Sequence, residues 1–167
     1  MKIKYTILLL LIVATFNSCS VYNFTGTGKI DAKTFQVNYF QNISELIEPG
    51  IERDFTLRLQ DLIQNQTNLS LTNSNADLLY EGEIVEYRTS PMTGTADQTA
   101  AQSRVTIVIN VRFTNKNKPE EDFEKRFSFF DDYSGNQQLV GAQLKTSLDK
   151  IFKRITQDIF NETLAKW

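Results

Sequence analysis

"QSRVTIVINVRFT", at Gln102–Thr114, is the clearest structural signal in the chain, because apolar and polar side chains alternate along it. Such a period of two places successive side chains on opposite faces of a β-strand. The apolar positions are Val105, Ile107, Ile109, Val111 and Phe113, and the polar positions are Arg104, Thr106, Asn110 and Arg112. The pattern predicts a long strand with one face against a core and one polar face.

A similar strand is predicted on each side of this one. The apolar positions are Leu78, Tyr80 and Ile84 before it and Phe123, Phe127 and Phe129 after it, opposite Glu81, Glu83, Glu124 and Arg126. A polar turn, "NKNKPEED" at 115–122, links the second and third strands. The other connection, "TSPMTGTADQTAA" at 89–101, exceeds the usual two to five residues of a hairpin loop, which suggests mobility or a function at its tip.

Shorter elements precede the three strands. Alternation at Phe35, Val37 and Tyr39 predicts one short strand, and "NLSLT" at 68–72 predicts another. Between them, apolar residues recur at helical spacing from Ile51 to Gln66, after a proline suited to a helix start. The same spacing predicts a final helix from Gln138 to Lys166.

This order of elements favours an α+β fold. Consecutive strands pair readily as antiparallel hairpins, and two amphipathic helices need an apolar surface to cover. We expect a two-layer sandwich in which two helices pack on one face of a small mixed or antiparallel sheet of four to five strands. The other face would be polar and rich in charge. It is either a solvated face held by cross-strand ion pairs, or a surface that docks in a wet cavity or against an anionic ligand.

No catalytic constellation stands out, and we expect a protein that is not an enzyme and uses no metal or cofactor. The 167-residue chain has no histidine, which removes the commonest general base and metal ligand. Asp131 and Asp132 would point to opposite faces of a strand, and "DDYSG" is expected to end that strand. The net charge of −2 also argues against bulk nucleic-acid binding.

The N-terminus has the features of a secretory signal. Lys2 and Lys4 precede an apolar run from Ile7 to Ala14, which is too short to span a bilayer. Ser18 and Cys19, the single cysteine, resemble the end of a bacterial lipobox, although Phe16 stands where leucine is preferred. The alternative is a buried or redox cysteine in an ordinary secreted protein.

We therefore expect three parts: a lipoprotein signal peptide at 1–18, a lipidated tether at 19–33 that begins with Cys19, and a domain at 34–167. Removing the signal leaves 149 residues with a net charge of −4, since Lys2 and Lys4 are lost and no acid precedes Asp31. That length suits one domain with a real core.

The chain resembles the LptE family of lipopolysaccharide-assembly lipoproteins, in the form found in Bacteroidetes-type bacteria. The resemblance extends over nearly all of 20–167, and its order of segments is more specific than any one of them. It is carried by "KTFQVNYFQN" (33–42), "FTLRLQDLIQNQTNLSLTNSNADLLYEGEIVEYRTSP" (55–91), "TAAQSRVTIVINVRFTN" (99–115), "PEEDFEKRFSFFDDY" (119–133) and "DIFNETLAKW" (158–167).

The resemblance implies a lipoprotein at the periplasmic face of the outer membrane. It would sit as a plug inside the β-barrel partner LptD, help that barrel assemble, and aid insertion of lipopolysaccharide into the outer leaflet. A lipid-anchored binding module or pilotin-like chaperone of another envelope complex is the alternative. If lipopolysaccharide binds directly, its phosphates should meet basic groups. The candidates are Arg104, Arg112, Lys116 and Lys118, although Glu81, Glu83 or Glu124 would neutralise the two arginines.

Overall fold

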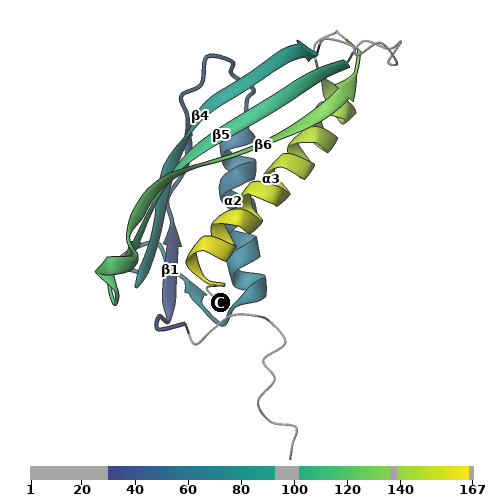
Figure 1. Ribbon diagram of the computed structural model, residues 1–167. Helices are drawn as coiled ribbons and strands as arrows, with labels where there is room; N and C mark the ends of the chain where they lie inside the picture. Colours follow the sequence, from purple (N-terminus) through teal and green to yellow (C-terminus); the bar gives the residue numbers. More distant parts are fainter. Residues whose placement is uncertain (1–29, 93–101, 136–138, 166–167) are drawn as a thin grey trace, which may run out of the picture.

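The computed structural model describes residues 30–92, 102–135 and 139–165. Its described elements form two layers, a six-stranded mixed sheet and two helices, and both helices cover the same face of the sheet (Figure 1). The strand order is β3-β1-β4-β5-β6, and β2 pairs with β4 beside β1. The predicted α+β sandwich is confirmed.

Three long antiparallel strands build the centre of the sheet. They are β4 (Leu78–Met92), β5 (Gln102–Asn115) and β6 (Phe123–Ser134). Ile109 of β5 lies opposite Ile84 on one side and Phe127 on the other, so the predicted apolar positions share one face. The polar connection from β5 to β6 contains a short 3₁₀ helix, η1 (Pro119–Glu121).

Two predicted strand ends were wrong. β4 continues through Thr89 to Met92, because Thr89 pairs with Val105 and Met92 with Gln102, and the rest of the predicted loop lies outside the described residues. β6 likewise continues through Asp131 and Asp132 to Ser134. In both places the ladder to β5 supplies backbone hydrogen bonds that outweigh the local preference for a turn.

A β-bulge at Val85 keeps the two faces of β4 consistent. Ile84 pairs with Ile109, but the next paired residue is Glu86, opposite Val108. If Val85 were an ordinary paired residue of the strand, strict alternation would turn Glu86 toward the core and Tyr87 toward solvent. The bulge keeps Glu86 on the polar face and leaves Tyr87 8% exposed on the core face.

The short strands at the other side of β4 are parallel to their neighbours. They are β1 (Thr34–Val37), β2 (Gln41–Asn42) and β3 (Ser70–Leu71). The sheet therefore has six strands rather than the predicted four to five, because a two-residue strand such as β2 has no readable periodicity. Ile30 and Ala32, just before β1, pack against the core.

The helices are α2 (Ile51–Gln66), with the predicted bounds, and α3 (Gly141–Thr163), which is shorter than predicted. At its start Val140 is extended, and at its end Leu164 leaves helical geometry. Phe55 of α2 meets Phe152 of α3 edge to face, with ring centroids 5.4 Å apart. Arg58 also bridges the two helices through Asp149, at 2.7 Å.

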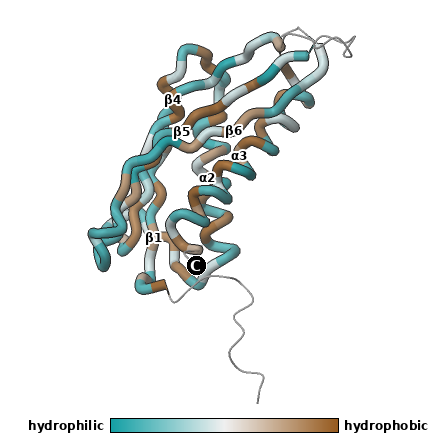
Figure 2. Tube along the Cα trace, in the orientation of Figure 1, coloured by the Kyte–Doolittle hydropathy of each residue, from teal (hydrophilic) through white to brown (hydrophobic). Residues whose placement is uncertain are grey.

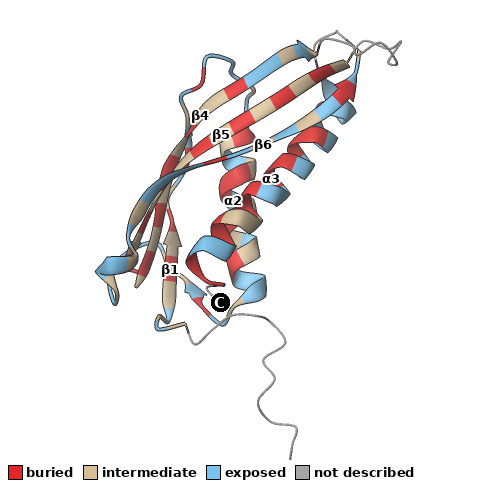
Figure 3. Cartoon of the chain, viewed as in Figure 1, coloured by how far each residue is buried: buried red, intermediate tan, exposed pale blue. Residues whose placement is uncertain are grey.

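The core lies between the two layers and includes buried residues of both helices and of the sheet. Figure 2 shows that hydrophobic and hydrophilic residues are interspersed along both helices. Buried and less buried positions alternate along β5 (Figure 3). The ring of Phe40 packs over Gly82, where an added Cβ would lie 2.6 Å from the ring and 2.0 Å from the carbonyl oxygen of Asn110. Only glycine fits this position.

Candidate functional site

The face of β4, β5 and β6 that points away from the helices is the main candidate surface, and we call it the outer face. No described helix or loop covers it (Figure 3). Cross-strand register places on it Glu81, Glu83, Glu86 and Arg88 of β4, Arg104, Thr106, Val108, Asn110 and Arg112 of β5, and Glu124, Arg126, Ser128, Phe130 and Asp132 of β6. Acidic and basic side chains nearly balance.

One end of the outer face is held by Arg112. Its guanidinium donates two hydrogen bonds to Glu83, at 2.9 and 3.1 Å. The hydrogen bond to Glu83 raises the pKa of Arg112, and the charges of Glu83, Glu124 and Glu81 add to this effect. On one side of this pair Asn110 donates to Glu124 at 2.6 Å, and on the other Asn38 donates to Glu81 at 2.7 Å.

Arg104 and Asp132 form a second two-pronged pair toward the other end of β5, at 2.7 and 2.9 Å. The guanidinium also stacks on Phe130, 3.7 Å from the ring centroid. Hydrogen bonds from Arg104 lower the pKa of the Asp132 carboxyl. Asp131 lies on the core face instead, where it accepts from Ser147 at 2.7 Å, so the two aspartates do point to opposite faces.

The four predicted lipopolysaccharide contacts do not form one cluster. Arg104 and Arg112 are eight residues apart on β5, which is about 26 Å in an extended strand. Lys116 and Lys118 follow β5 at the end where Arg112 lies. Lys116 donates to Asn75 at 2.7 Å, and Lys118 lies 3.9 Å from Glu121.

Sequence reasoning missed two outer-face residues, Phe130 and Val108, and it predicted Arg126 on this face but not that it lacks an ion pair in the described part of the chain. Phe130 is 42% exposed there, Val108 lies at its centre, and Arg126 is an exposed cation without an ion pair among the described residues. The alternation from Phe127 and Phe129 predicts the outward position of Phe130. The pairing of Arg112 with Glu83, a diagonal neighbour, depends on rotamers that sequence spacing does not specify.

The outer face can act as a flat polar contact surface. Arg104 and Arg112 are neutralised by carboxylates on neighbouring strands, and exposed pairs of this kind each contribute little to stability. Among the described residues, no three or more His, Cys, Asp or Glu side chains could hold a metal ion. None of the helices in the described part of the chain is long and apolar enough to cross a membrane. Cys19 and the predicted signal peptide lie outside the described residues.

A small mixed sheet with two helices on one face, and a polar face left open, defines a two-layer α+β domain. The sequence profile of the LptE lipopolysaccharide-assembly family matches residues 32–163. The chain belongs to this family, as its sequence resemblance predicted. Comparison with curated proteins gave no significant match.

Solved structures share the fold at low sequence identity. A protein from Xanthomonas campestris is 9% identical and aligns with 83% of this chain and 86% of its own, with a TM-score of 0.54. A hypothetical protein from Chlamydia trachomatis is 11% identical and aligns with 81% of this chain and 99% of its own, with a TM-score of 0.52. These similarities support the fold alone.

Proposed function

We propose that this chain is a lipid-anchored outer-membrane protein that plugs an LptD-type β-barrel from the periplasmic side. In this role it helps the barrel assemble and assists insertion of lipopolysaccharide into the outer leaflet. The proposal depends chiefly on membership of the lipopolysaccharide-assembly family, since that family match extends over almost the whole described domain.

The outer face gives this role a physical basis. A plug must present polar groups to a wet lumen while it keeps its own apolar core covered. Both helices are used for the core, which leaves the outer face for contact. Because Arg104 and Arg112 are already paired within the sheet, a hydrated partner surface need not supply a counter-charge for either of them.

Arg104, Arg112, Lys116 and Lys118 remain the proposed lipopolysaccharide contacts. Lipid phosphates would have to replace Asp132 at Arg104 and Glu83 at Arg112, whereas Lys116 and Lys118 lie in a turn. Arginine binds phosphate and carboxylate with the same two-pronged, charge-assisted bonds, so each exchange would replace one pair with another of the same kind.

We further propose that the mature protein begins at Cys19, that 19–33 tethers the lipid to the domain, and that the domain begins at 34. Several acyl chains hold a protein at a membrane far more stably than one. Replacing Cys19 with alanine should abolish incorporation of radioactive fatty acid into the protein. Equal incorporation into the variant would exclude Cys19 as the lipid acceptor.

The function is tested by depleting the protein and measuring lipopolysaccharide at the cell surface. Depletion should lower surface lipopolysaccharide and leave it in the inner membrane, and wild-type protein should restore it. A Thr106→Glu/Val108→Glu variant should restore it poorly, because two added charges at the centre of the outer face oppose docking.

The matched control adds the same charge on the helix layer. Gln143 and Thr146 are exposed on α3, so Gln143→Glu/Thr146→Glu should restore surface lipopolysaccharide fully. Unchanged surface lipopolysaccharide after depletion would contradict the proposed function. Equal rescue by both variants would contradict the assignment of the outer face.

A further inference from the structure

The sheet has an open edge along the second half of β4. On that side β1 and β2 pair with β4 only as far as Ile84, whose carbonyl accepts from the backbone N–H of Ile43 at 3.0 Å. No described strand continues the sheet there beside Glu86–Met92, so the sheet narrows to β4, β5 and β6 (Figure 1).

The β4 backbone groups that face this open edge can be identified from the β4 carbonyls that already accept hydrogen bonds on the same side. Tyr80 and Ile84, both on the core face, direct their carbonyls to the β1 and β2 side. Along a strand, the edge toward which a residue's backbone N–H and C=O point alternates with the same period of two as its side-chain face. The core-face residues after the bulge therefore also direct their carbonyls toward the β1 and β2 side. Tyr87, Thr89 and Pro91 therefore offer their carbonyls to a new strand, and Tyr87 and Thr89 also offer N–H groups.

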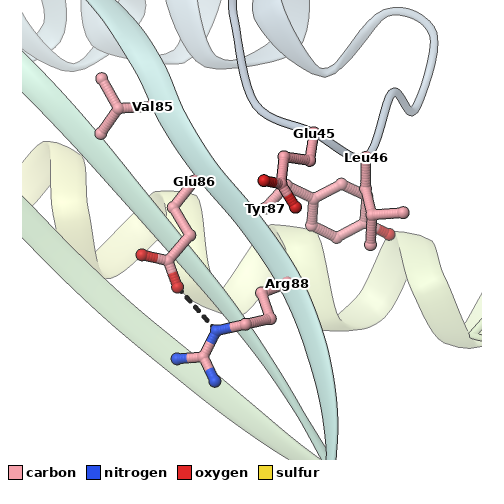
Figure 4. Close-up of a pocket in the computed structure, with 6 residues that line it drawn as sticks. All are labelled: Glu45, Leu46, Val85, Glu86, Tyr87 and Arg88. Carbon is pink, nitrogen blue, oxygen red and sulfur yellow. Dashed lines mark hydrogen bonds and ion pairs between the residues drawn. The ribbon is translucent and has the colours of Figure 1, made fainter.

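A pocket of about 510 Å³ lies beside this edge, lined by Glu45, Leu46 and Val85–Arg88. Figure 4 shows the ring of Tyr87 beside Glu45 and Leu46, while Arg88 reaches back to Glu86 at 2.8 Å. The loop that borders the pocket exposes three large apolar side chains, those of Ile43, Leu46 and Ile47, and Ile47 is 76% exposed.

The pocket and the loop beside it carry a net negative charge. Arg88 neutralises Glu86, whereas Glu45 and Glu48 have no ion-pair partner in the described ranges. Burial raises the pKa of the Tyr87 phenol, and the negative charge of Glu48 adds to this effect. A ligand that fits the pocket should therefore combine apolar side chains with basic ones.

The terminal strands of the sheet are the two-residue β3 and the long β6, and β6 carries charges that oppose strand addition. Lys125 and Asp131 lie on its core face, where Lys125 pairs with Glu162 of α3 at 2.9 Å and Asp131 pairs with Lys150 at 3.1 Å. Inward-pointing charges are a known protection of edge strands. The core-face positions of the open β4 edge carry no charge, and Pro91 is the single residue there that lacks an N–H.

We propose that Tyr87–Pro91, with the apolar loop of Ile43, Leu46 and Ile47, is a strand-addition site for an extended segment of the barrel partner. The inference rests on the proposed function. The segment carries apolar and basic side chains, and backbone bonds to β4 hold it. It comes from a loop or a chain end of the partner, because the strands of a closed barrel have no free edge.

Photo-crosslinking tests both proposals in the full-length, membrane-bound protein. A benzophenone amino acid replaces Thr89 at the β4 edge, Thr106 on the outer face, or Lys145 on α3 as a control, and adducts are mapped by mass spectrometry. We expect adducts with the barrel at positions 89 and 106 and no adduct at position 145. The adduct at position 89 should map to a loop or a terminal segment of the barrel protein. Barrel adducts at 106 but not at 89 would overturn the edge inference alone, and no barrel adduct at either position would overturn both.

A backbone variant tests the hydrogen-bonding mode. Thr89→Pro removes one outward N–H and leaves the β5 ladder intact, whereas Thr89→Val keeps that N–H. The proline variant should yield about three- to tenfold less barrel on purification than the valine variant. Circular dichroism melts of both would verify folding. Equal recovery with both variants folded would overturn strand addition, as would adducts at 89 with a protein other than the barrel.

Discussion

At the scale of single residues, Gly82 has the strictest requirement in the described domain. It faces the core at a position where the Phe40 ring and the Asn110 carbonyl leave no room for a side chain. The sequence shows a glycine between two glutamates in a predicted strand, which usually weakens a strand. The close approach of an aromatic ring explains it, and this could not be predicted without the tertiary contact.

Gly82→Ala should therefore destabilise the domain by at least about 2 kcal/mol, because a backbone carbonyl and a packed ring must shift. Chemical denaturation of the unlipidated domain measures this. Gly50→Ala is the comparison, since Gly50 has a φ of 92° but open space around it, and its cost should be near 1 kcal/mol. A Gly82→Ala cost no larger than that of Gly50→Ala would refute the packing explanation.

Asp77 connects β1 to the start of β4. Its carboxylate accepts the backbone N–H groups of Lys33 at 2.7 Å and Thr34 at 3.0 Å, and these bonds lower its pKa. A carboxyl whose pKa is lowered by folding stabilises the folded state at pH values above its ordinary pKa of about 3.9. This stabilisation is lost as the pH falls through the pKa that the carboxyl has in the folded state.

Asp77→Asn should accordingly melt at a lower temperature than wild type at pH 7. The gap should shrink as the pH falls below about 4, because protonation then removes the same charge from the wild-type protein. Thermal melts between about pH 2 and pH 7 measure the gap. A gap that stays constant over this range would mean that the ionised carboxylate is not what stabilises the β1 connection.

At the scale of elements, periodicity predicted the long strands and α2, and it failed at short or interrupted ones. β5 was predicted throughout because every alternate residue fits. β2 was missed because two residues carry no period. Cross-strand ion pairs on the outer face were predicted, but which residues pair depends on strand register and on rotamers. Asp132 was therefore not predicted as the partner of Arg104.

The bulge at Val85 gives a test at this scale. Deleting Val85 restores strict alternation between Ile84 and Glu86, so the fold should survive at a cost of about 1 kcal/mol or less. Deleting Val108 from β5 should cost more than about 3 kcal/mol, because it turns the following core residues to the outer face. Denaturation of the two deletion variants compares them, and similar costs would exclude a simple extra-residue bulge.

At the scale of the whole molecule, one layer buries the apolar surface and the other leaves a polar sheet face open. The helices contact each other through Phe55, Phe152 and the Arg58–Asp149 pair, and their buried residues belong to the domain's own core. Two surfaces remain available at the sheet, the outer face and the second half of the β4 edge. A partner that encloses the domain can contact both at once.

The central claim is that this domain forms a stable complex with an outer-membrane barrel of the LptD type. Affinity purification of the tagged full-length protein from detergent-extracted outer membranes tests it most directly, with protein identification by mass spectrometry. We predict that the barrel is recovered as the main partner in a single species of constant stoichiometry. Recovery of the tagged protein without the barrel, or with the components of another envelope complex, would contradict the claim.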